Sequence, residues 1–113
     1  MADRWTVTVR RRGRTEREQF DAAAQAFAAA ERQIDALART EGRATAKVFA
    51  REIEPVAQVA ARIELAGPGG QRGGVDLRGD GSAEAFTGRW RKQVVEARRG
   101  EDAVAALRRA LGG

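Results

Sequence analysis

The stretch FDAAAQAFAAAERQIDALAR, residues 20–39, decides the fold of this chain. Its apolar side chains recur in two interleaved seven-residue series, Phe20-Phe27-Ile34 and Ala23-Ala30-Leu37. This spacing places them in one stripe along an α-helix and leaves the charged residues opposite. We therefore predict an amphipathic helix over residues 21–40, lying on a sheet, with Gly42 as its C-terminal stop.

Two short strands are expected before this helix. Residues 5–9 alternate, with Trp5, Val7 and Val9 on one face, which is typical of a half-buried strand. Gly13 is the expected turn residue, and residues 15–20 would return antiparallel. This second segment is very polar, as an edge strand must be if it is to resist pairing with another chain.

The segment after the helix is less regular. Residues 44–54 fit either a strand or a helix, and we favour a strand that ends before Pro55. Residues 59–65 alternate clearly, and residues 75–78 resume a strand. Asp80-Gly81 is a hairpin signal. The return strand would hold Phe86 and Trp90 on one face and continue to Val95, and a final helix is expected over residues 101–111.

The expected fold class is α+β, a single domain over residues 1–113. Its element order would be β-β-α-β-β-β-β-α, with two helices packed on one face of a largely antiparallel sheet. Residues 67–74, GPGGQRGG, are predicted to form a flexible glycine-rich loop. A phosphate-binding role for this loop is disfavoured, because Gly73-Gly74 leads into a strand and not into a Gly-Lys-Ser/Thr helix start.

Composition limits the function. The chain has 113 residues, a formal charge of +5 and no histidine, cysteine or tyrosine. Nucleophilic triads and most zinc sites need those side chains, so we expect no enzyme, no metal and no cofactor. No signal peptide or membrane-spanning run is evident, and a cytoplasmic location without a membrane partner is predicted.

Basic side chains gather in two clusters. Arg10, Arg11, Arg12 and Arg14 would lie at a hairpin tip, and Arg89, Arg91 and Lys92 flank Trp90. Both clusters could contact phosphates. However, the basic residues are almost all arginine, and alanine and glycine are also abundant, which indicates a GC-rich genome as a second source of the charge.

The preferred hypothesis is a non-catalytic binding module that holds DNA or RNA without regard to sequence, through these two clusters. The alternative is a protein-interaction or self-assembly module that pairs through its sheet. An enzyme without histidine or cysteine chemistry is the third hypothesis.

Two segments, residues 53–65 and 74–89, resemble a group of short uncharacterised proteins from GC-rich bacteria, a resemblance that implies no function. From residue 21 the expected order α-β-β-β-α is also similar to a double-stranded-RNA-binding domain. Those domains usually place lysines at the start of the last helix, where this chain has Glu101 and Asp102. That departure counts against the second likeness.

Overall fold

Strand β1 (Trp5–Arg11) shows how the alternating sequence becomes a two-sided sheet. Trp5, Val7 and Val9 are buried, as predicted, and the threonines between them point to the opposite face. The computed structural model describes residues 4–11, 13–48, 59–79, 82–88 and 91–112, and for residues 40–48 and 59 it describes only the backbone.

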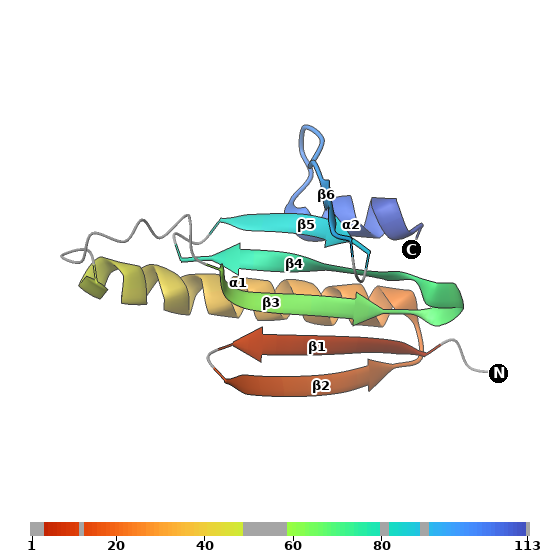
Figure 1. Ribbon diagram of the computed structural model, residues 1–113, viewed down its shortest axis with the longest axis horizontal. Helices are drawn as coiled ribbons and strands as arrows, with labels where there is room; N and C mark the ends of the chain where they lie inside the picture. The colour runs from red at the N-terminus through yellow and green to blue at the C-terminus, as the bar shows by residue number, and fades with distance from the viewer. Residues whose placement is uncertain (1–3, 12, 49–58, 80–81, 89–90, 113) are drawn as a thin grey trace.

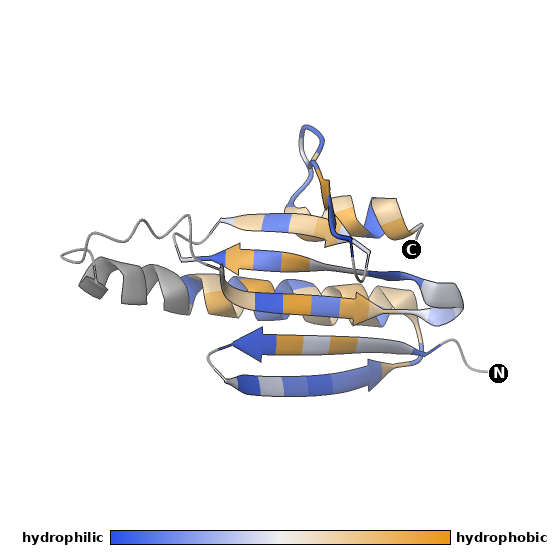
Figure 2. Cartoon of the chain, in the orientation of Figure 1, coloured by the Kyte–Doolittle hydropathy of each residue, from blue (hydrophilic) through white to orange (hydrophobic). Residues whose placement is uncertain are grey.

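The described strands form one six-stranded sheet in the order β2-β1-β3-β4-β5-β6. Its other members are β2 (Arg14–Phe20), β3 (Val59–Ala66), β4 (Arg72–Arg78), β5 (Ala83–Thr87) and β6 (Gln93–Val95). Every neighbouring pair is antiparallel. The polar strand β2 lies at one edge, as predicted, and most of its length has the hydrophilic colour in Figure 2.

Helix α1 (Ala23–Val48) is longer than the sequence indicated. Its 26 residues span about 39 Å, whereas the eight residues of β3 span about 26 Å. The helix therefore extends past the sheet (Figure 1). Two predictions are wrong here: Gly42 does not stop the helix, and residues 44–48 are helical instead of a strand. The remainder of that predicted strand, residues 49–54, lies outside the described residues.

One hydrophobic core joins both helices to the same face of the sheet. The predicted stripe of α1 is confirmed, because Phe27, Ala30, Ile34 and Leu37 are all buried. They pack with alternate residues of β3 and β4 and with Leu107 of helix α2 (Ala103–Leu111). The fold class is thus α+β with an antiparallel sheet covered by two helices on one face, as predicted (Figure 1).

The glycine-rich segment is shorter as a loop than the sequence predicted. A 3-10 turn over Pro68–Gly70 connects β3 to β4, and β4 already begins at Arg72. Gly73 and Gly74 are buried strand residues. A Cβ atom on Gly73 would lie 2.7 Å from the side chain of Leu107, so this glycine admits helix α2 close to the strand.

The predicted last strand is divided in two. Strand β5 ends at Thr87, Gly88 has a φ of 97°, and β6 begins at Gln93. The positive φ of Gly88 turns the chain out of the extended conformation, so the predicted long strand with Phe86 and Trp90 on one face does not continue past Thr87. Trp90 itself, like the predicted turn residues Asp80 and Gly81, lies outside the described residues.

Helix α2 uses the two acidic residues at its start for structure. The side chain of Asp102 accepts a hydrogen bond from the backbone nitrogen of Ala105 at 2.8 Å, which caps the helix. Glu101 accepts from the guanidinium of Arg109 at 3.0 Å and from the backbone nitrogen of Arg98 at 2.8 Å. Within the described part of the chain, no helix is both long and apolar enough to cross a membrane.

Candidate functional site

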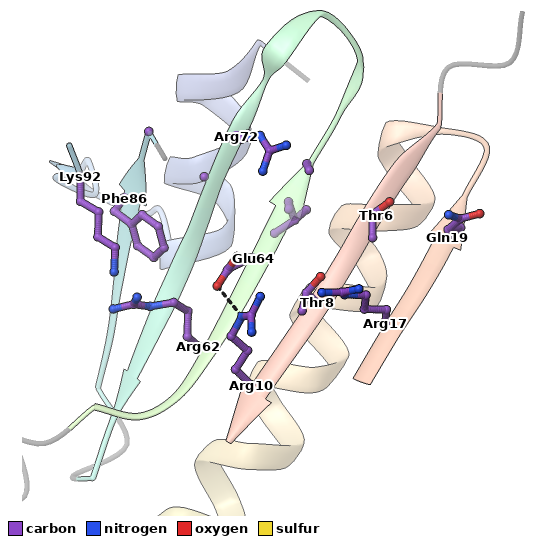
Figure 3. Close-up of a pocket in the computed structure, with 14 residues that line it drawn as sticks. Thr6, Thr8, Arg10, Arg17, Gln19, Arg62, Glu64, Arg72, Phe86 and Lys92 are labelled. Carbon is purple, nitrogen blue, oxygen red and sulfur yellow. Dashed lines mark hydrogen bonds and ion pairs between the residues drawn. The ribbon is translucent and has the colours of Figure 1, made fainter. Parts of the chain in front are cut away.

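The sheet face opposite the helices, which we call the open face, carries many polar side chains. Strand pairing aligns Arg17, Thr8 and Glu64 in one row across β2, β1 and β3. A depression of about 440 Å³ lies on this face (Figure 3). We call it the basic depression, because five of its lining side chains are cations: Arg10, Arg17, Arg62, Arg72 and Lys92.

Two of the five cations are neutralised by carboxylates. The Nε of Arg10 lies 2.9 Å from an oxygen of Glu64. Arg62 donates two hydrogen bonds to Asp76, of 2.6 and 3.2 Å, in the bidentate geometry that guanidinium groups favour. The hydrogen bond to Asp76 raises the pKa of Arg62, and burial opposes it. These pairs leave little charge for a ligand.

The other three cations, Arg17, Arg72 and Lys92, have no carboxylate at ion-pair distance among the described residues. All three side chains are exposed. They come from β2, from the start of β4 and from the residue before β6, and Figure 3 shows them on different sides of the depression. The basic depression therefore offers unpaired positive charge at separated points.

Neutral hydrogen-bonding groups lie between these cations. Thr6 and Thr8 project from β1, and Gln19 projects from β2 beside them. A hydroxyl can donate to a phosphate oxygen, and the amide nitrogen of a glutamine can do the same. Glu64 is the single acid that lines the depression among the described residues, and Arg10 already occupies it.

Phe86 is the aromatic residue that lines the depression. It pairs directly with Gly74 across β4 and β5, and the ring lies against that glycine. The guanidinium carbon of Arg62 lies 5.3 Å from the ring centroid, and the ammonium of Lys92 lies 4.8 Å from it. Two cations thus contact one ring, which leaves Phe86 only 5% exposed.

The structure does not bring all described members of the two predicted basic clusters to one surface. Arg10 and Lys92 do line the same depression, although 82 positions separate them in the sequence. Arg11 and Arg14 pair with each other across β1 and β2, and alternation directs them to the helix-covered face. Arg91 is exposed and does not line the depression. Arg12 and Arg89 lie outside the described residues.

Three cations of the depression were missed by the sequence reasoning: Arg17, Arg62 and Arg72. Each stands alone in the sequence or beside acids, so no local cluster marks it. Alternation did place Arg62 and Glu64 on the polar face of their strand. The missing signal was the register between strands, which brings single arginines from β2, β3 and β4 to one place.

Comparison with known proteins identifies no family model, no curated protein and no solved structure that matches this chain. The resemblance of residues 53–65 and 74–89 to short bacterial proteins therefore stays a prediction. Among the described residues, no group of three or more metal-ligating side chains lies together.

Proposed function

We propose that this protein is a non-catalytic module that binds nucleic acid, DNA or RNA, on the open face of its sheet. The phosphate contacts would be Arg17, Arg72 and Lys92. The observation that carries the proposal is that these three exposed cations share one depression and lack carboxylate partners among the described residues. A cation without a carboxylate partner breaks no ion pair when it binds a phosphate. A paired cation must first break its ion pair with the carboxylate.

The arrangement favours an extended polyanion over a small one. Strands in a sheet are about 4.8 Å apart, so the backbones of β2 and β4 are separated by about 14 Å and those of β4 and β6 by about 10 Å. The three cations lie around the depression and do not converge on one point (Figure 3). A chain of phosphates can reach all of them, while a single phosphate group can satisfy only some.

The affinity would come from charge neutralisation and the release of condensed counterions. For three phosphate contacts to a single strand, the affinity falls with about the second power of the salt concentration. Between about 50 and 200 mM salt this corresponds to a loss of roughly 20-fold. Binding is therefore expected at low ionic strength and should be largely independent of base sequence.

The self-assembly alternative would use the free edge of β2. That edge is seven residues long. Its exposed residues include Arg14, Glu16, Arg17 and Glu18, and charges of this density keep an edge strand from pairing with another chain. The open face is for this reason the preferred surface.

The test compares two arginines of one strand. Arg14 and Arg17 are both exposed on β2, but only Arg17 lines the depression. Fluorescence anisotropy with a mixed-sequence 20-nucleotide single strand at ~50 mM salt should give an affinity about three- to tenfold lower for Arg17→Gln than for the unchanged protein. Arg14→Gln removes the same charge and should have little effect.

Arg72→Gln and Lys92→Gln should behave like Arg17→Gln. Equal losses for Arg14→Gln and Arg17→Gln would mean that diffuse charge, and not the depression, holds the nucleic acid. An absence of binding by the unchanged protein at this salt concentration would overturn the proposal altogether.

A further inference from the structure

Phe86 is the one aromatic side chain that the described residues place on the open face. Trp5 and Phe27 are in the core, and Phe20 packs against it from the helix-covered side. The ring of Phe86 instead faces the basic depression, beside the cations that we assign to phosphates (Figure 3). An aromatic ring among phosphate-binding cations is the combination that single-strand-binding surfaces use.

The two cations over this ring are held in different ways. Arg62 is fixed by its two hydrogen bonds to Asp76. Lys92 is exposed, has no carboxylate partner among the described residues, and contacts the ring at 4.8 Å. Lys92 also precedes β6 and lies outside its ladder. The cover that Lys92 provides is therefore the one that can move.

Replacing the Lys92 ammonium over the Phe86 ring with a stacked base should increase the affinity. An exposed cation–π contact changes an equilibrium constant by about two- to fivefold. A base stacked on an aromatic side chain changes it by about five- to 150-fold. The displaced ammonium does not stay unpaired, since a phosphate of the same strand lies next to the stacked base.

We propose that Phe86 is a stacking site for one base of a single-stranded nucleic acid, and that Lys92 covers it until a phosphate draws the ammonium away. This inference rests on the proposed function and adds a selectivity to it. In a duplex the bases are already stacked and paired, so a duplex can use the cations but not the ring. The module should thus prefer single strands to duplexes.

Phe86 has a second role that the test must separate. Its ring covers Gly74, where no side chain exists, and removing it altogether would expose the backbone of β4. Phe86→Leu keeps an apolar cover on Gly74 but removes the aromatic face. Thermal unfolding and the amide NMR spectrum check that this variant is folded.

The experiment measures the binding of the full chain to three probes. They are a mixed-sequence 20-nucleotide single strand, the matching duplex and inorganic polyphosphate. Phe86→Leu should lower the affinity for the single strand by about tenfold. It should leave the affinities for duplex and polyphosphate within about twofold. Arg17→Gln should lower the affinity for all three probes, because every probe offers phosphates.

A second measurement does not need a variant. With phenylalanine labelled, the ring protons of Phe86 should shift upfield when the single strand is added and stay in place with polyphosphate. An unchanged single-strand affinity of Phe86→Leu, or an equal loss for all three probes, would overturn the stacking site while leaving the phosphate contacts intact. If the unchanged protein binds none of the probes, the proposed function fails as well.

Discussion

At the scale of single residues, Gly74 is a tightly constrained position on the open face. It faces Phe86 directly across β4 and β5. A Cβ atom added at Gly74 would lie 2.4 Å from the carbonyl oxygen of Ile63 and 2.7 Å from the ring of Phe86. The ring can turn aside, but the carbonyl belongs to the ladder between β3 and β4 and cannot. Gly74 therefore fixes where Phe86 lies.

Gly74→Ala should destabilise the protein by about 3 kcal/mol, the upper part of the range for overpacking a well-filled site. Urea unfolding followed by circular dichroism measures the change in the free energy of unfolding. Gly69→Ala is the comparison, because Gly69 has a φ of 68° but open space around it. Only the left-handed backbone opposes that change, at a cost of about 1 kcal/mol. Equal losses for the two variants would contradict the contact at Gly74.

At the scale of elements, helix α2 is held to the preceding loop by one acidic side chain. Glu101 accepts hydrogen bonds from the guanidinium of Arg109, at 3.0 to 3.3 Å, and from the backbone nitrogen of Arg98. The same guanidinium donates to the carbonyl of Glu96 at 3.0 Å. The hydrogen bond from Arg109, followed by that from Arg98, lowers the pKa of Glu101 below its ordinary value of 4.5.

This lowered pKa of Glu101 predicts a pH dependence. A carboxyl group with a depressed pKa in the folded state adds stability above its ordinary pKa and loses it as the pH falls through the folded value. Glu101→Gln should therefore lower the melting temperature at pH 7, and the difference from the unchanged protein should shrink below about pH 4.5. Glu96→Gln, a change at an exposed carboxyl in the same loop, is the control.

Thermal unfolding from pH 7 to pH 3 measures both variants. A difference between Glu101→Gln and the unchanged protein that stays constant over this range would contradict an ionised Glu101 as the source. A loss in Glu96→Gln as large as that in Glu101→Gln would mean that the loop responds to its overall charge.

The elements also show which parts of the fold the sequence could predict. The stripe through Phe27 and Ile34 and the alternation in β1 and β3 are local patterns, and the structure confirms them. The predicted end of α1 was wrong. A glycine such as Gly42 destabilises a helix interior by only about 1 kcal/mol, and neighbours with high helix propensity outweigh this cost. A single glycine followed by residues of high helix propensity therefore need not end a helix.

The predictions for the glycine-rich segment and for the last strand were wrong for another reason. Gly73 and Gly74 are strand residues at which a side chain would clash with Leu107 and Phe86. Those contacts lie 34 and 12 positions away in the sequence, so no local signal gives them. The same holds for the basic depression, because the strand register brings Arg17, Arg72 and Lys92 around one depression, where they have no carboxylate partner among the described residues.

At the scale of the whole molecule, the two faces of the sheet have different roles. The helices cover one face and complete the core, while the other face keeps Arg17, Arg72 and Lys92 exposed. The formal charge of +5 belongs to the chain as a whole and does not by itself indicate a binding surface. What distinguishes the open face is that it gathers Arg17, Arg72 and Lys92 around one depression. Among the described residues these three have no carboxylate at ion-pair distance, whereas Arg10 and Arg62 are paired.

The salt dependence of single-strand binding tests this central claim most directly. For the unchanged protein, the logarithm of the affinity should fall against the logarithm of the salt concentration with a slope of about −2. The triple variant Arg17→Gln, Arg72→Gln and Lys92→Gln should have a slope close to zero. A second triple variant, with Arg11, Arg14 and Arg32 changed to glutamine, loses the same charge elsewhere and should keep the slope near −2. Equal slopes for the two triple variants would contradict the claim that the open face holds the nucleic acid.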